Sequence, residues 1–237
     1  MFAIKRRNLI IISVLIITAM TFIICFSAIS ARPVGEASST NIKVVLDAGH
    51  GGIDGGVSGV YTGVKESDLN LSVCKKVQKY LQDSGISVVL TRNTDAGLYG
   101  IATKNLKKRD MQKRKEIIEQ AKPDLVISIH MNKYSVSTRR GAQVFYKQSD
   151  EYGKLLADRI QESFNGMENN VKKTSALSGD YYILNCSDYP SVIAECGFLS
   201  NPEDESLLIT DDYQDDIAYA IFKGIIGYLS SLPTATY

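Results

Sequence analysis

The chain has 237 residues, and its 27 basic and 26 acidic side chains leave a net charge of +1. Proteins that bind nucleic acid normally carry a strong positive excess, so no nucleic-acid partner is expected. The length suits one domain with a substantial core. The four cysteines show no C-x-x-C spacing, so the sequence predicts neither a disulfide framework nor a cysteine-rich zinc site.

The first 30 residues predict a membrane anchor or a signal segment. Residues 9–29 are apolar or small and uncharged, and three cations precede them. Such a stretch can span a bilayer with its basic end in the cytoplasm. Ala28 and Ser30 offer an alternative, a cleavage pattern before Ala31. The anchor is preferred, and both alternatives make the rest of the chain extracytoplasmic, either membrane-anchored or secreted.

Residues 31–41 are small and polar and predict a linker, followed by a domain over residues 42–232. The predicted strands are 43–46, 86–91, 125–129, 142–146, 181–184 and 191–196, and the predicted helices are 68–84, 104–121, 150–164 and 212–230. Ser67 is expected to cap the first of these helices and Gly85 to end it. This alternation predicts an α/β fold with a mostly parallel, twisted sheet flanked by helices.

Both histidines of the chain, His50 and His130, close predicted strands. Open α/β sheets carry their working residues beyond the carboxyl ends of the strands, so both imidazoles are expected at one edge. Matched imidazoles at such an edge indicate a shared metal ion, whereas capping by hydrogen bonds is the alternative for either one alone.

Two carboxylates are candidates for the same site. Glu195 interrupts an apolar strand, where a carboxylate is unfavourable to bury unless something pairs with it. A metal centre would be that partner, and solvent or an arginine is the alternative. Glu66 lies at a helix start, where the dipole favours acidic residues anyway, so its role stays open on physical grounds. Two histidines and one glutamate form the ligand set of a catalytic zinc site with an open fourth position.

The segment 49–56 is rich in glycine, which predicts a sharp turn and close approach of substrate. A phosphate-binding loop is disfavoured because the Gly-Lys-Ser/Thr ending is missing. Asp47, just before this loop, is expected either to orient His50 as a hydrogen-bond acceptor or to cap the turn.

Four blocks in this order resemble the zinc-dependent N-acetylmuramoyl-L-alanine amidases: residues 47–52, Glu66, residues 127–132 and residues 195–201. The resemblance extends from Ile42 to about Ser230. It implies one zinc ion held by His50, Glu66, His130 and water, with Glu195 as the catalytic glutamate. Arg92 and Arg114 also match the family pattern and are interpreted as scaffold, with contact to substrate as the alternative.

The resemblance further implies hydrolysis of the amide between the lactyl group of N-acetylmuramic acid and L-alanine of the peptidoglycan stem. An anchored domain without wall-binding repeats is most similar to the sporulation and germination enzymes of the family, which remove stems so that muramic-δ-lactam forms in the spore cortex. The chain would then act between the spore membranes.

Two other functions are weighed against this one. A zinc peptidase that cuts within stem peptides would share the fold and the ligands, and a catalytically silent module could bind the wall or a partner protein. Glu195 argues against the silent module. A requirement for an accessory protein is left open by the sequence.

Overall fold

The structure is a computed structural model, and it describes residues 18, 20, 42–169 and 172–233. The membrane segment predicted at residues 9–29 lies outside the described residues apart from Thr18 and Met20, and the linker at 31–41 lies wholly outside them. In the part of the chain that is described, no helix has both the length and the apolar character needed to cross a membrane.

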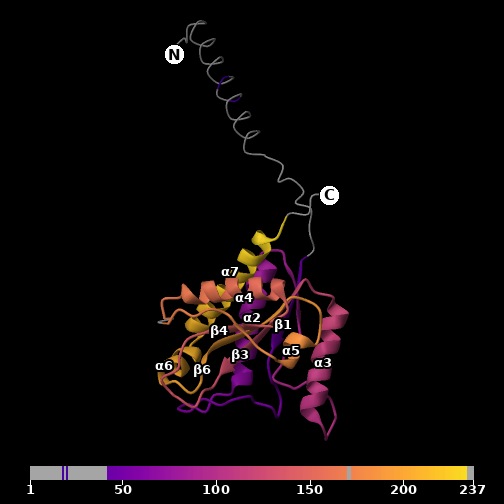
Figure 1. Cartoon of the computed structure of the whole chain (residues 1–237), viewed down its shortest axis with the longest axis vertical. Helices are drawn as coiled ribbons and strands as arrows, with labels where there is room; N and C mark the ends of the chain where they lie inside the picture. The colour runs from indigo at the N-terminus through magenta and orange to yellow at the C-terminus, as the bar shows by residue number, and fades with distance from the viewer. Residues whose placement is uncertain (1–17, 19, 21–41, 170–171, 234–237) are drawn as a thin grey trace, which may run out of the picture. The chain divides into compact units, whose positions relative to one another are not determined.

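Six strands form one mixed sheet in the order β2-β1-β3-β6-β4-β5 (Figure 1). The strands are β1 (Lys43–Ala48), β2 (Ser87–Leu90), β3 (Leu125–Asn132), β4 (Gln143–Tyr146), β5 (Leu177–Ser178) and β6 (Ser191–Phe198). Of the strand pairings, only β4 with β6 is antiparallel. The chain returns from β3 to β4 through a short loop with no crossover helix, which reverses the strand direction.

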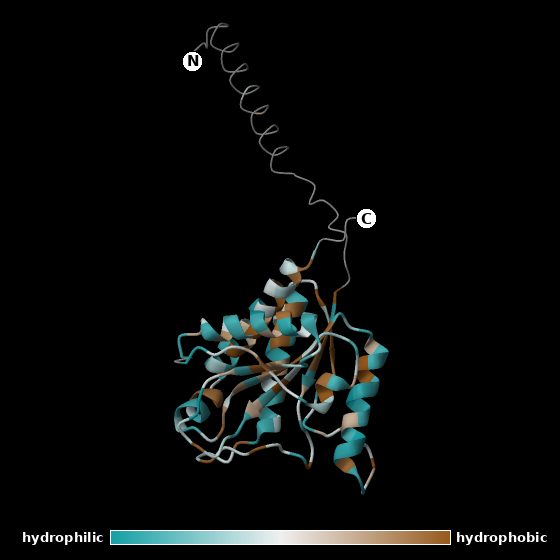
Figure 2. Ribbon diagram, in the orientation of Figure 1, coloured by the Kyte–Doolittle hydropathy of each residue, from teal (hydrophilic) through white to brown (hydrophobic). Residues whose placement is uncertain are grey.

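Helices cover both faces of the sheet. They are α2 (Glu66–Asp83), α3 (Leu106–Ala121), α4 (Glu151–Asn165), α5 (Tyr182–Asn185), α6 (Pro202–Leu208) and α7 (Asp211–Ser231). One core joins a sheet face to α2, α4 and α7, and a smaller core joins the other face to α3 and α5. Successive side chains of β1 enter the two cores in turn: Val44 belongs to the first core and Val45 to the second. The strands are therefore apolar on both sides, and Figure 2 shows the helices as amphipathic.

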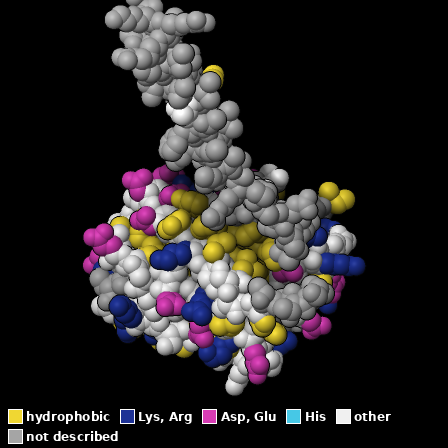
Figure 3. Space-filling view, turned by 90° about the horizontal axis from the view of Figure 1, so that it is seen from above, with side chains coloured by type: hydrophobic (Ala, Val, Ile, Leu, Met, Phe, Trp, Pro, Cys, Tyr) yellow, Lys and Arg dark blue, Asp and Glu magenta, His cyan; other side chains and the backbone are white. Residues whose placement is uncertain are grey.

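The amino ends and the carboxyl ends of the parallel strands face opposite ways. Figure 3 views the domain from the side of the amino ends, where acidic and basic side chains are interspersed and no histidine is visible. His50 follows the carboxyl end of β1, and His130 lies near the carboxyl end of β3. The predicted edge is thus the one that carries them.

The prediction of a strand at 181–184 is wrong, because these residues enter the short helix α5. A four-residue apolar run has no periodicity that separates strand from helix, and here Ile183 and Leu184 pack into the smaller core as helix residues. The edge strand lies earlier, at Leu177–Ser178. The sequence analysis also missed α6, which Asn201 caps by accepting a hydrogen bond from the Asp204 amide.

The two ends of α2 differ in how well they were predicted. Lys65 occupies the N-cap position, and its side chain makes no capping hydrogen bond. Ser67 is already inside the helix, so the prediction that Ser67 caps it is wrong. Gly85 ends the helix as predicted, with a φ of 79°. Its amide donates to the Gln82 carbonyl, and the next amide donates to Leu81, which is the paired bonding of a Schellman motif.

Two buried arginines hold the loop that carries His50. Arg114 reaches from α3 and donates to the Ala48 and His50 carbonyls at 2.8 and 2.6 Å. Arg92 donates to the Ala48 and Gly49 carbonyls at 2.8 and 2.9 Å, and to the Ser67 carbonyl at the start of α2. These contacts confirm the interpretation of both arginines as scaffold.

Asp47 neutralises Arg114 rather than contacting His50. Its carboxylate also accepts hydrogen bonds from Thr91 and Ser128 at 2.7 and 2.6 Å. Both expectations for Asp47 are therefore wrong. Burial opposes its ionisation, yet the Arg114 charge and the two hydroxyl donors prevail and lower the Asp47 pKa to about 2.

Replacing Asp47 with asparagine removes the charge that faces Arg114 and keeps the shape. We expect Asp47→Asn to lower the free energy of unfolding by about 2–3 kcal/mol at neutral pH, because the buried guanidinium of Arg114 loses one of its two carboxylate partners and keeps Asp110. Ionised Asp47 stabilises the fold above its unfolded-state pKa of about 4, and this stabilisation is lost as the pH falls toward the folded value of about 2. The difference between the two proteins should therefore shrink over that range.

Urea unfolding of both proteins across this pH range measures the difference. The exposed Asp95→Asn is the matched control and should unfold like the wild type. A wild-type advantage that persists undiminished in acid would contradict the assignment.

Candidate metal and active site

His50 lies two residues beyond the end of β1, with its backbone in the left-handed region at a φ of 61°. Arg114 holds its carbonyl in that conformation. The imidazole lies between two carboxylates: Nδ1 is 2.9 Å from the Asp54 carboxylate, and Nε2 is 3.3 Å from Glu66. Asp54 thus fixes the ring and leaves Nε2 directed at the site.

Glu66 is the first residue of α2, and its side chain is buried. One carboxylate oxygen accepts a hydrogen bond from the Val57 amide at 2.8 Å. The other lies 2.8 Å from His130 Nδ1 and accepts from the Met131 amide at 3.2 Å. The helix start therefore places this carboxylate between the two histidines, as the resemblance implied.

Two glycines of the loop make this approach possible. A Cβ at Gly49 would lie 2.2 Å from the His130 ring, and one at Gly56 would lie 2.3 Å from the Glu66 carboxylate. Either side chain would have to displace one of these groups. The predicted close approach at the glycine-rich loop is thus made by the protein's own His130 and Glu66.

His50, Glu66 and His130 could together hold a metal ion. Each offers one ligand atom, and the three atoms lie within 4.8 Å of one another. Tetrahedral zinc with bonds of about 2.0–2.2 Å places its ligand atoms about 3.3–3.6 Å apart. The observed separations of 3.3 Å and 2.8 Å around Glu66 are close to that, and the donor set suits zinc. The residues therefore fit the ion that the resemblance implies.

Contacts between these histidines and carboxylates stabilise the charged forms of His50 and Glu66. Burial disfavours a charged His50, but the contacts with Glu66 and Asp54 raise its pKa to about 9. Burial likewise opposes ionisation of Glu66, and its contacts with His130 and His50 outweigh this and lower its pKa. Glu66 is thus held as the anion, the form that can bind a cation.

Glu195 lies beside His130, because the two residues are register partners in β6 and β3. Its Oε2 atom is buried and has no hydrogen-bond partner among the described residues. Burial raises the Glu195 pKa to about 7. A buried carboxyl group without a partner, next to the candidate metal ligands, can hold or release a proton near neutral pH.

All four predicted site residues line one cleft of about 490 Å³. Tyr181 and Tyr182 form part of its wall, and Lys107 and Lys133 lie at it as well. Glu195 and burial together raise the pKa of Tyr181, with burial the larger effect. Because these tyrosines and lysines extend the lining of the cleft, it can receive a substrate that is longer than the span of the four central residues.

The sequence analysis did not predict the roles of two residues of the site, Asp54 and Asn70. Asp54 orients His50, a function that was expected of Asp47. Asn70 donates to the Gly49 carbonyl at 3.1 Å and to Glu66 at 3.3 Å, and so ties the loop to the helix. A signal for Asn70 existed, since a polar residue four positions after Glu66 lies on the same side of the helix.

Comparisons with known proteins agree with this geometry. The Amidase_3 family, described as N-acetylmuramoyl-L-alanine amidase, matches residues 44–227. A germination-specific N-acetylmuramoyl-L-alanine amidase of Bacillus subtilis (strain 168) is 35% identical over 194 residues, 79% of each chain.

Solved structures show the same fold. The CwlD amidase from Clostridioides difficile, in complex with the GerS lipoprotein, matches with a TM-score of 0.77 and 37% identity, over 80% of this chain and 99% of that one. An N-acetylmuramoyl-L-alanine amidase from Clostridium difficile 630 matches with a TM-score of 0.72 and 29% identity, over 82% of this chain and 100% of that one. The chain therefore belongs to the N-acetylmuramoyl-L-alanine amidase family.

Proposed function

We propose that this amidase uses zinc to hydrolyse the bond between the lactyl group of N-acetylmuramic acid and L-alanine of the peptidoglycan stem. One observation carries the proposal: three donor atoms lie within 4.8 Å of one another, beside a buried carboxylate that has no hydrogen-bond partner among the described residues. The family membership supports the substrate class.

The residues divide the chemistry between them. His50, Glu66 and His130 would hold Zn²⁺, which when bound supplies a Lewis acid for the amide carbonyl and for water. Glu195 takes a proton from the attacking water and returns it to the departing amine, because its carboxyl group can exist in either form near neutral pH. Asp54 keeps Nε2 of His50 available by binding Nδ1.

The alternative functions differ in product or in turnover. A peptidase acting within the stem would share this site, but it would leave L-alanine attached to the sugar. A silent binding module would not need a carboxyl group buried beside the metal ligands, where burial is unfavourable unless the group is used. The position of Glu195 therefore favours a hydrolase.

The setting of the reaction is part of the proposal. A relative is named as germination-specific, and a solved neighbour is bound to a lipoprotein. We therefore infer that this chain matures the spore cortex and that an accessory protein of the same kind assists it. The apolar stretch at 9–29 supports an extracytoplasmic, anchored or secreted location.

Product analysis tests the reaction. Peptidoglycan incubated with the purified protein and zinc should release peptides with a new L-alanine amino terminus, as read by mass spectrometry. Glu195→Gln should lower this activity at least about 100-fold, because the proton carrier is lost while the shape is kept. The exposed Glu119→Gln is the control. Stems that begin after L-alanine, or full activity in Glu195→Gln, would refute the assignment.

Zinc binding tests the metal site without turnover. Asp54→Asn should weaken zinc binding about 10–100-fold, because His50 loses the carboxylate that orients its ring. His130→Ala should weaken it further, since a ligand is removed. Competition with a chromophoric chelator measures both, and Asp95→Asn is the control. Wild-type zinc affinity in His130→Ala would rule out this site.

Spores test the setting. In a spore-forming host of this chain, deletion of its gene should leave a cortex without muramic-δ-lactam, because the lactam forms only after the stem is removed. Muropeptide analysis of the spores measures this, with the wild-type gene as rescue and Glu195→Gln as the inactive control. A normal lactam content after deletion would argue against the cortex role.

A further inference from the structure

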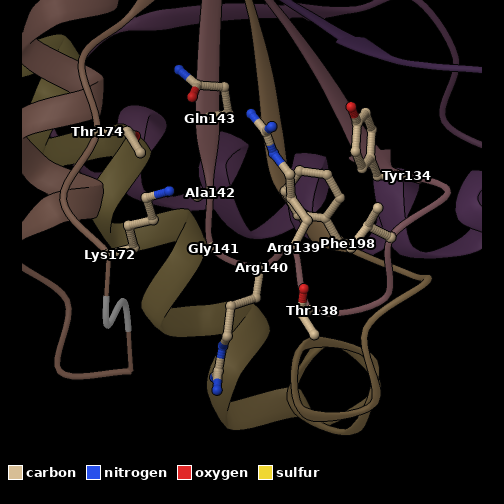
Figure 4. A pocket seen from close by; sticks show the side chains of 11 residues that line it. Tyr134, Thr138, Arg139, Arg140, Gly141, Ala142, Gln143, Lys172, Thr174 and Phe198 are labelled. Carbon is tan, nitrogen blue, oxygen red and sulfur yellow. The ribbon is translucent and has the colours of Figure 1, made fainter.

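Figure 4 shows a second cavity, of about 290 Å³. We call it the Arg139 pocket; it is lined by Tyr134, Val136, Thr138, Arg139, Arg140, Gly141, Ala142, Gln143, Lys172, Thr174 and Phe198. The two cavities are neighbours, because Lys133 lines the cleft and Tyr134 lines the pocket. Gln143 of the pocket is also the register partner of Glu195.

Two cations of the pocket, Arg139 and Lys172, have no neutralising carboxylate in the described part of the chain. Arg140 points away from Arg139 in Figure 4 and forms an ion pair with Asp204 at 3.4 Å. Arg139 instead lies over the Tyr134 ring, with its guanidinium carbon 5.1 Å from the ring centre. Among the described residues, no carboxylate lies within ion-pair distance of Arg139 or Lys172. Such a pocket favours an anionic ligand.

The order of the strands says which part of the substrate reaches this pocket. The metal ligands follow or lie on β1 and β3, or begin α2, whereas Glu195 lies on β6 and the pocket borders β4. If Glu195 returns a proton to the departing amine, the amide nitrogen lies on the Glu195 side. The released peptide then extends toward β4, and the sugar lies toward β1.

The general dimensions of strands and extended chains allow a peptide to connect the two sites. Neighbouring strands lie about 4.8 Å apart, and an extended chain spans about 3.5 Å per residue. A carboxylate on the second or third residue of the stem therefore reaches the pocket from a bond placed at Glu195. The ring of Tyr134 supports one face of the Arg139 guanidinium, whose planar fork matches a carboxylate in two-point contact.

From these observations we infer that Arg139 and Lys172 bind a carboxylate of the stem peptide, on the leaving-group side of the scissile amide. This inference rests on the proposed function, because it takes the orientation of the substrate from Glu195. It adds a specificity site that requires a free carboxylate on the peptide, in contrast to a metal centre that needs only the amide.

Peptide binding tests this inference without turnover. The probe is L-alanyl-γ-D-glutamyl-L-lysine with both carboxylates free, compared with its diamide, titrated into the full chain in a nonionic detergent. The wild type should bind the free acid about 10-fold more tightly. Arg139→Gln and Lys172→Gln should each lose most of this preference and leave diamide binding unchanged.

The controls are Lys173→Gln and Arg109→Gln, which remove exposed cations that do not line the pocket. Both should bind like the wild type. Equal binding of acid and diamide, no measurable binding of the acid at millimolar concentration, or an equal loss in Lys173→Gln would overturn the inference. Turnover of peptidoglycan by the same preparations separates the two proposals. Cleavage without acid preference defeats only the pocket. Acid preference without cleavage defeats the amidase reaction and the assignment of the pocket to the leaving-group side, and leaves a carboxylate site at Arg139 and Lys172.

Discussion

The site depends on a buried ion pair between Arg114 and Asp47. A guanidinium in the protein interior is stable only when a counter-charge and acceptors surround it, and here Asp47, Asp110 and two backbone carbonyls do so. Because one of those carbonyls belongs to His50, the same contacts hold a left-handed backbone that is uncommon for residues other than glycine. The contacts that neutralise a charge in the core thus also set the direction of a candidate metal ligand.

Glu66 plays the corresponding part at the centre of the site. Its carboxylate lies against both histidines and accepts two backbone amides, so it is held as an anion despite burial. Glu195, one strand further along, has no such donors, and burial leaves its proton exchangeable near neutral pH. Two carboxylates in one cleft therefore differ in how readily they take up a proton, because only one of them has hydrogen-bond donors among the described residues.

The sheet order gives the cleft a direction. Strands β1, β3, β6 and β4 lie side by side, so the candidate metal ligands, Glu195 and the Arg139 pocket follow one another in that order. The antiparallel β4 matters here, since the loop that enters it brings Arg139 and Tyr134 next to the carboxyl end of β6. A mixed sheet thus places the Arg139 pocket next to the candidate metal site.

The sequence by itself determined the fold class, most helices and strands, and the four central residues. Apolar periodicity, strand-end histidines and a carboxylate in an apolar strand are local signals, and the four blocks resembled one family. Only the tertiary structure decided that Asp54 rather than Asp47 contacts His50 and that 181–184 enters a helix. It also decided that Arg140 pairs with Asp204, whereas Arg139 has no carboxylate partner among the described residues. The reason is physical: which charges meet, and which short apolar run becomes a strand, depends on neighbours distant in the chain.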